Sequence, residues 1–284
     1  IIQYMASYHF HDEKLMHHLF HVMHHMLNNH WHKLTPSQKA DIEMGIKILG
    51  SGPNEDIVIT RYNKNRDELK VKFPGYEKIE TDYAQTLQDI FVLTMLNGKT
   101  NGTFLEIGGC FPFHNNNTAL LEQTFGWSGV SVEYDKKFVD QYVAERPNVK
   151  MLYSNALTIN YKNIIKENFD GTIIDYLQLD IDPANNTYQC LLKIPFDDYK
   201  FRVITYEHDY TIDISKSFRE KSRQYLREKG YVLVAGNISP TKNEPYDYPY
   251  EDWWIHPELI EPAILEKMSE PDQAVLQAKN YLFL

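Results

Sequence analysis

From residue 81 onward, short apolar segments alternate with longer segments in which apolar residues recur at helical spacing. The short segments predict strands and the longer ones predict helices. Strands are expected at 103–107, 130–133, 149–153, 176–180, 203–207, 231–235 and 252–256. Helices are expected at 82–96, 118–125, 137–146, 162–168, 186–192 and 215–229. Strands separated by helices are typical of an α/β fold with a doubly wound, mostly parallel sheet.

The first 80 residues do not follow this alternation. Nine of the 12 histidines lie between residues 9 and 32, in a stretch whose apolar positions have helical spacing. A second helix is expected to begin at Thr35, because Thr35-Pro36-Ser37-Gln38 has the residues of a helix-capping box. Two short strand-like segments, at 57–62 and 69–73, predict a hairpin. We therefore expect an accessory N-terminal region over 1–80, with helices and a short hairpin, and a second domain over 81–284.

The histidine-rich helix carries His17, His21 and His25 four residues apart on one face. Histidine pairs at this spacing can chelate Zn²⁺. No cysteine or carboxylate completes a set of four ligands there, so we assign no metal to this helix. A polar face that packs, or that joins copies of the chain into a homo-oligomer, is the favoured interpretation.

Residues at the carboxyl ends of the predicted strands are the first place to look for a ligand site, because ligands bind there in doubly wound sheets. The first strand ends in Glu106-Ile107-Gly108-Gly109, and the second ends in Glu133. Glycines let the backbone approach a ligand closely, and a carboxylate after the second strand can accept the hydroxyl protons of a ribose. Either feature alone is also typical of a turn or a solvated strand end. Their order on successive strands favours a ligand that contains a nucleoside.

In the order in which they occur, these segments resemble the FkbM-type methyltransferases. The resemblance is carried by 104–118, Leu121-Glu122, 125–130, Val132-Glu133, 176–182, Pro195-Phe196, Tyr206-Glu207-His208 and 230–234, within about residues 80–256. It implies a class I methyltransferase with a Rossmann-like sheet and S-adenosylmethionine as the methyl donor. It also implies a hydroxyl acceptor on a sugar or a glycosylated substrate.

The same resemblance implies a set of cofactor-binding residues. They are Glu106, Gly108, Gly109, Asn117, Thr118, Glu133, Tyr134, Asn155, Ala156 and Asp180. The first three would shape the pocket for the methionine end, Glu133 would take the ribose, Asn155 and Ala156 would border the adenine, and Asp180 would close the methionine side. The sequence departs from the family at 110–114, where a further glycine is usual, and at Tyr134, where proline is common.

Two neighbouring strands are predicted to end in acidic groups, at Asp180-Ile181-Asp182 and Glu207-His208-Asp209. Methyl transfer to an alcohol needs a base to remove the hydroxyl proton. A histidine has an intrinsic pKa of about 6.5, which suits that task near neutral pH. We therefore predict that His208 is the catalytic base and that Glu207, Asp180 or Asp182 orients it. The same carboxylates are suitable ligands for Mg²⁺, and a divalent metal is left open without being assigned.

The composition of the chain indicates which kinds of molecule it binds. With 29 basic and 39 acidic residues the net charge is −10, which argues against nucleic acid, because affinity for phosphates comes from lysine and arginine. No apolar run reaches the roughly 18–20 residues of a transmembrane helix, and no secretory signal is recognised. The two cysteines lie far apart, as suits a reducing compartment. We expect a cytoplasmic protein that acts on a small-molecule or glycan acceptor.

Two other functions are left open by the residues. An NAD-dependent sugar-modifying enzyme would use a similar glycine turn and acidic residue, although the G-x-G-x-x-G pattern is absent. A catalytically degenerate methyltransferase fold that serves as a binding module would suit the altered loop at 110–114. Late in the chain, Tyr246, Tyr248 and Tyr250 precede the strand with Trp253 and Trp254, of which we expect one buried and one at the surface. These tyrosines could line an acceptor site for carbohydrate.

Overall fold

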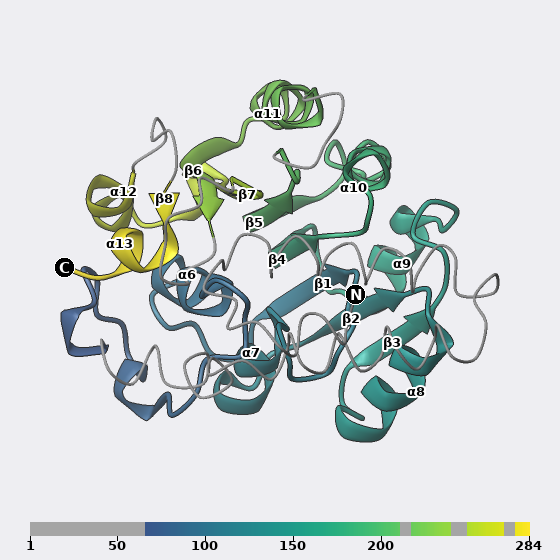
Figure 1. The fold of residues 1–284 in the computed structure, drawn as a ribbon, viewed down its shortest axis with the longest axis horizontal. Coiled ribbons are helices and arrows are strands. Elements are labelled where there is room, and N and C mark those ends of the chain that lie inside the picture. Colours follow the sequence, from purple (N-terminus) through teal and green to yellow (C-terminus); the bar gives the residue numbers. More distant parts are fainter. Residues whose placement is uncertain (1–65, 211–216, 240–248, 270–275) are drawn as a thin grey trace, which may run out of the picture. The chain divides into compact units, whose positions relative to one another are not determined.

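The computed structural model of the protein describes residues 66–210, 217–239, 249–269 and 276–284. Within them, eight strands form one sheet in the order β3-β2-β1-β4-β5-β7-β6-β8 (Figure 1). The strands are β1 (Thr103–Ile107), β2 (Ser128–Glu133), β3 (Lys150–Tyr153), β4 (Ile173–Leu179), β5 (Lys200–Glu207), β6 (Val232–Ser239), β7 (Glu251–Ile255) and β8 (Leu276–Gln277). The α-helices are α6 (Gln88–Met95), α7 (Ala119–Phe125), α8 (Lys136–Glu145), α9 (Tyr161–Asn168), α10 (Ala184–Leu191), α11 (Phe218–Glu228), α12 (Pro262–Met268) and α13 (Ala278–Leu282).

The sheet is parallel except at β7, which runs antiparallel between β5 and β6. Apolar side chains on one face of the sheet pack with α6, α7, α12 and α13, and those on the other face pack with α9, α10 and α11. This confirms the prediction of a doubly wound, mostly parallel Rossmann-like sheet. From β1 the chain adds β2 and β3 toward one edge of the sheet, and from β4 it adds the later strands toward the other edge. The strand order therefore reverses between β1 and β4.

The α6 helix begins six residues later than the apolar spacing predicts. The carboxylate of Asp89 accepts hydrogen bonds from the backbone N–H groups of Tyr83 at 2.9 Å and Ala84 at 3.3 Å. Leu87 has a positive φ of 67° immediately before the helix. The segment 82–87 is therefore a folded turn, held by the side chain of the helix that follows it.

The predicted strand at 69–73 contains only a single bridge, between Leu69 and Phe283. The prediction of a strand there is wrong because these residues are anchored by side-chain burial: Leu69 and Phe73 are buried in the core, and Phe73 packs edge-on against Phe125 of α7. The first strand of the predicted hairpin and the histidine-rich helices lie outside the described residues. The boundary at residue 80 stays a prediction.

Strand β7 matches the predicted strand at 252–256, but both of its tryptophans are buried. Trp253 and Trp254 are each 0% exposed, because β7 lies inside the sheet and helices cover both faces. Trp253 stacks on Phe91 of α6 with ring centroids 4.3 Å apart, and Tyr281 of α13 packs edge-on against it. Among the described helices, none is long and apolar enough to cross a membrane.

Candidate functional site

A cavity of about 190 Å³ lies at the carboxyl ends of β1 and β4, where the order of the sheet reverses. This is the position at which doubly wound sheets bind their ligands. The described residues that line it are Gln85, Glu106, Gly108, Gly109, Cys110, Phe111, His114, Asn115, Asn116, Asn117, Gln178 and Asp180. Five predicted cofactor residues are therefore brought together there: Glu106, Gly108, Gly109, Asn117 and Asp180.

Gly108 forms the contact between the two strand ends. Its φ is +91°, and a Cβ atom at this position would lie 1.8 Å from the carbonyl oxygen of Asp180. The two backbones cannot separate easily, because Asp180 donates its N–H to the carbonyl of Ile107 at 3.1 Å and Gly108 donates its own to Val132 at 2.9 Å. Only glycine fits this turn, which brings Asp180 against the end of β1.

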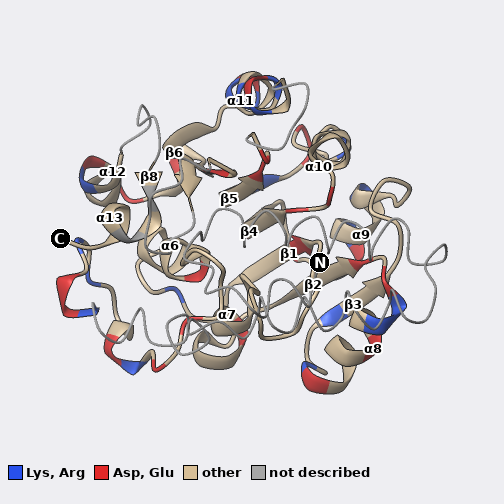
Figure 2. Cartoon of the chain, viewed as in Figure 1, with Lys and Arg blue, Asp and Glu red and all other residues tan. Residues whose placement is uncertain are grey.

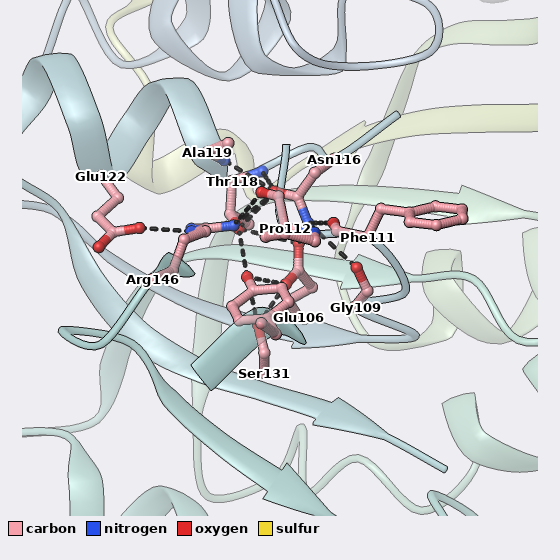
Figure 3. A network of polar contacts seen from close by, with 11 residues as sticks. Glu106, Gly109, Phe111, Pro112, Asn116, Thr118, Ala119, Glu122, Ser131 and Arg146 are labelled. Carbon is pink, nitrogen blue, oxygen red and sulfur yellow. Dashed lines mark hydrogen bonds and ion pairs between the residues drawn. The ribbon is translucent and has the colours of Figure 1, made fainter. Parts of the chain in front are cut away.

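Glu106 lies at the base of the cavity wall and is only 1% exposed (Figure 3). Its carboxylate accepts hydrogen bonds from Thr118 Oγ1 at 2.9 Å, Asn116 Nδ2 at 3.2 Å and Tyr142 OH at 2.7 Å, and also from the hydroxyl of Ser131. Burial raises the pKa of Glu106, against the opposing effect of these donors and of a nearby arginine. With two donors on each oxygen, Glu106 shapes the wall and supports its neighbours.

The arginine is Arg146, which follows α8 and is 0% exposed. Its guanidinium donates to Glu122 Oε2 at 2.5 Å, Asn116 Oδ1 at 2.8 Å, Thr118 Oγ1 at 3.1 Å and the carbonyl of Pro112 at 3.2 Å (Figure 3). It thus joins α7, α8 and the glycine loop in one network. Sequence reasoning did not mark Arg146 as a site residue, because nothing in the local pattern distinguishes a buried charged residue at the end of a helix from an exposed one.

Glu133 lies at the end of β2 and holds the glycine loop. Its Oε2 accepts the N–H of Cys110 at 2.9 Å, and its Oε1 accepts the N–H groups of Tyr134 and Asp135, both at 2.8 Å. A carboxylate oxygen accepts about two hydrogen bonds. Within the described part of the chain, one position on Oε2 is thus left for a further donor such as a ribose hydroxyl.

Asn155 and Ala156, which were predicted to border the adenine, follow β3 and are not among the residues that line the cavity. The loop 154–156 adjoins β2, because Ser154 donates its N–H to the carbonyl of Glu133 at 2.9 Å. Asn155 Oδ1 accepts the N–H of Leu157, and Ala156 is buried. Tyr134 is 70% exposed beside them. Thr118, the remaining predicted contact, points to Glu106.

The loop at 110–114 has bulky side chains where the resemblance leads us to expect a further glycine. Cys110 and Asn115 have positive φ angles of 44° and 52°, and Phe111 packs against Phe138 of α8 with ring centroids 4.7 Å apart. Next to this loop, Asn117 is 6% exposed, and its Oδ1 has no hydrogen-bond partner among the described residues. A buried acceptor without a partner costs free energy, and a ligand ammonium would satisfy it. The cavity therefore offers a buried acceptor to a hydrogen-bond donor of a ligand.

Acidic residues follow the ends of β4 and β5 (Figure 2). Leu179 of β4 pairs with Tyr206 of β5. The residues that follow them, Asp180 and Glu207, therefore lie next to each other at the ends of the two strands. Glu207 also pairs with Glu251 at the start of β7. Burial, together with repulsion from neighbouring carboxylates, raises the pKa values of Asp180 and Glu207 well above their ordinary range. In the described parts of the chain, no three acidic, histidine or cysteine side chains are arranged to hold a metal ion.

His208 does not line the cavity. Its ring is 0% exposed, its Nδ1 accepts the N–H of Tyr210 at 3.1 Å, and its Nε2 lies 3.4 Å from Asp252 Oδ1. Asp252 also receives two hydrogen bonds from Arg223 at 2.7 Å each, on the face of β7 opposite to Glu251. Burial lowers the pKa of His208. These contacts hold the ring of His208 inside the protein and away from the cavity. They give no support to His208 as the catalytic base.

The tyrosines expected to line an acceptor site are only partly described. Tyr246 and Tyr248 lie outside the described residues. Tyr250 is 2% exposed, and its hydroxyl contacts that of Thr86 and accepts from Gln88 Nε2 at 3.0 Å. It therefore joins β7 to α6 beneath the acidic side chains.

Glu251 makes the stability of the protein dependent on pH. Burial raises the pKa of this carboxyl from 4.5 to about 8, while Gln88 and Trp253 donate hydrogen bonds to it. Between these two values the folded chain holds more protons than the unfolded chain, so stability falls as the pH rises. Glu251→Gln, which mimics the protonated carboxyl, is expected to flatten this fall. Thermal unfolding from pH 5 to pH 9 measures it, and parallel profiles for the two proteins would contradict the prediction.

No protein-family model matches the sequence, and no curated protein has a matching sequence. The chain is similar to the solved structure of an O-methyltransferase from Bacillus cereus in complex with SAH, with 16% identity, 61% of this chain and 81% of that chain covered, and a TM-score of 0.44. It is also similar to TrmK from M. capricolum in complex with S-adenosyl-homocysteine (13% identity, 63% and 73% covered, TM-score 0.42). A third is a TehB-like SAM-dependent methyltransferase from Corynebacterium glutamicum (12% identity, 62% and 89% covered, TM-score 0.39). Similarity at this level does not assign an activity.

Proposed function

We propose that the protein is a class I methyltransferase that uses S-adenosylmethionine to methylate a hydroxyl group of a sugar or glycosylated substrate. The observation that carries the proposal is the cavity at the reversal of the sheet, which joins three features. Gly108 brings the ends of β1 and β4 into contact, Asn117 presents a buried acceptor without a described partner, and Asp180 supplies a carboxyl group.

In this proposal, Asn117 accepts a hydrogen bond from the ammonium of the cofactor, Asp180 closes the methionine side of the pocket, and Glu133 accepts a hydrogen bond from the ribose. Asn155, Ala156 and Tyr134 border the adenine. When bound, S-adenosylmethionine supplies a methyl group on a positively charged sulfonium. The carboxyl groups around Asp180 favour this positive charge, because opposite charges attract more strongly near a protein interior than in bulk water.

A sugar hydroxyl as acceptor is supported by the resemblance of the sequence to FkbM-type enzymes and by the charge of the cavity. No lysine or arginine is among the described residues that line it, whereas Glu106 and Asp180 are. A phosphorylated acceptor would meet like charge there. A neutral polyol can instead donate its hydroxyl protons to carboxylates.

One observation favours a second function, a module that binds the cofactor without turnover. The described lining reaches Cys110 and Asn115 but not Glu133, so the bulky loop separates the cavity from the predicted ribose site. Such a module would bind the donor and its demethylated product but transfer nothing.

The full chain, tested by calorimetry with S-adenosylmethionine, S-adenosylhomocysteine and NAD, separates these functions. The proposal expects binding of the first two and none of NAD. Incubation with methyl-labelled donor and a panel of neutral methyl glycosides then tests transfer, read by mass spectrometry. A folded chain that binds neither methionine compound would overturn the proposal, and binding without transfer to any glycoside would favour the binding module.

Glu133→Ala is expected to weaken binding of S-adenosylmethionine by about 2–4 kcal/mol. The change removes the acceptor for the ribose and also releases the N–H of Cys110, which Glu133 holds at 2.9 Å. Calorimetry on the full chain measures the effect, with Asp140→Ala as the control, because Asp140 is an exposed acidic residue of α8. Equal affinity of the two variants would remove Glu133 from the cofactor site.

A further inference from the structure

We propose that Asp180 and Glu207 act as one carboxyl pair, which shares a single proton and accepts the second proton from the hydroxyl that is methylated. This inference rests on the proposed function and assigns the base for that reaction. The proposed base lies on the face of the sheet that carries the cavity. It replaces His208, which lies on the other face, as the candidate for this role.

The alternation of side chains brings these two groups to one face. Leu177 and Leu179 pack with the helices α9 to α11, so Gln178 and Asp180 face the other way, toward the cavity that they line. On β5, Ile204 and Tyr206 pack on the α9–α11 side, and Glu207 therefore shares the face of Asp180. Since Leu179 and Tyr206 are paired in register, the next residues, Asp180 and Glu207, are neighbours at the ends of adjacent strands.

An independent feature marks this cavity as a ligand site. Asn117 is 6% exposed, lines the same cavity as Asp180, and has an Oδ1 atom without a hydrogen-bond partner among the described residues. Asn117 comes from the β1 side, whereas Asp180 comes from the β4 side. A ligand held by Asn117 would thus lie between the glycine loop and the carboxyl pair.

Titratable groups, most of them acidic, lie near the pair on several neighbouring elements. Asp182 follows β4, Asp209 follows β5, and Glu251 and Tyr250 come from β7 and the residue before it. Across the cavity lie Glu106 of β1 and the thiol of Cys110. Burial and the carboxylates of Glu133, Asp180 and Glu106 raise the pKa of this thiol to about 12. Burial and like charge raise the pKa of both members of the pair. Two neighbouring carboxyl groups repel each other when both are ionised, which favours a single proton held between them.

A pair that keeps one proton is a stronger base than an ordinary exposed carboxylate. The acceptor oxygen forms a bond to the methyl carbon, and the bond from that carbon to sulfur breaks with its electron pair remaining on sulfur. The hydroxyl proton moves to the pair, which then holds two protons. The positive charge of the sulfonium and the one negative charge of the pair are lost together, so the net charge of the site does not change.

The same pair restricts the acceptor to neutral or cationic groups. A phosphate on the ring that is methylated would approach a negative pair flanked by Asp182 and Asp209. Like charges at short range in a buried site repel strongly. A neutral methyl glycoside should therefore be a substrate, and the corresponding glycoside 6-phosphate should not.

The test compares the full chain with Glu207→Gln, Asp180→Asn and Asp170→Asn. Asp170 is exposed and lies before β4, at the opposite end from Asp180, so it is a matched control. With labelled donor and the methyl glycosides, Glu207→Gln and Asp180→Asn are expected to lower kcat by about 10²–10⁴-fold. Glu207→Gln should leave donor affinity within about twofold of the native value, because Glu207 acts on the acceptor.

A second measurement does not need turnover. Infrared difference spectra between pH 5 and pH 9 should show a buried protonated carboxyl band that titrates above neutral pH in the native chain. The variant Glu251→Gln should lose the part of this band that comes from Glu251. Double variants that combine Glu251→Gln with Glu207→Gln or Asp180→Asn should also lose the part that comes from the pair. A native kcat and pH profile in a folded Glu207→Gln variant, or an unchanged carboxyl band in both pair variants, would overturn the inference. If the native chain fails to bind donor while the band behaves as expected, the proposed function fails and the shared proton stands.

Discussion

Arg146→Met is expected to lower the free energy of unfolding by about 3–5 kcal/mol. Arg146 is 0% exposed and forms an ion pair with Glu122, whose side chain is also buried. Without the guanidinium, the carboxylate of Glu122 would keep no hydrogen-bond partner among the described residues. Breaking one side of a buried ion pair costs more than the pair contributes, because it leaves an uncompensated charge. Urea unfolding of the full chain measures the loss.

Two further variants make this prediction specific. Lys136→Met removes an exposed ion pair with Asp140 on α8 and is expected to cost less than about 0.5 kcal/mol. The double variant Arg146→Met with Glu122→Met replaces both charges and should be more stable than Arg146→Met alone. If the second change instead destabilises further, the cost of Arg146→Met comes from lost packing and the role assigned to the charge is wrong.

The parts of the fold that the sequence predicts are those set by local pattern. The strand at 103–107 is recovered residue for residue as β1, and Glu106, Gly108, Gly109 and Asp180 meet at one cavity because parallel strands end at one edge. Hydrophobic alternation specifies such strands well, since a shift by one residue would turn every side chain to the wrong face.

His208 shows the limit of predicting a site from strand ends alone. It follows Glu207 by one residue, and successive side chains of a strand point to opposite faces. Counting from the apolar residues of β5 would have placed Glu207 with Asp180 and turned His208 away. What the sequence could not indicate is the partner of His208, because Asp252 reaches it from β7, which lies far along the chain and pairs antiparallel with β5.

Contacts between distant segments account for the other differences. The turn at 82–87 depends on one carboxylate, that of Asp89, competing for backbone N–H groups that a helix would otherwise use. The C-terminal elements α12, β8 and α13 have no clear periodicity of their own and are held by burial, as where Tyr281 packs on Phe91 and Trp253. Local propensity is a weak predictor where tertiary packing decides.

Gly108→Ala is expected to cost about 3–5 kcal/mol of stability and to abolish binding of S-adenosylmethionine. Two effects add. The φ of +91° disfavours any side chain, and the new Cβ would lie 1.8 Å from the carbonyl oxygen of Asp180. Relief would require β1 and β4 to move apart, against the hydrogen bond from Asp180 N–H to the carbonyl of Ile107 at 3.1 Å.

Gly230→Ala separates these two effects, because Gly230 has a φ of +87° but nothing within 4 Å of the added Cβ. It should cost about 1–2 kcal/mol from the backbone conformation alone. The remaining difference between the two variants measures the contact with Asp180, and urea unfolding reports both. If Gly108→Ala is no less stable than Gly230→Ala, the ends of β1 and β4 are not in the close contact on which the cavity depends. If it is less stable and still binds the donor, the contact is structural and the cofactor lies elsewhere.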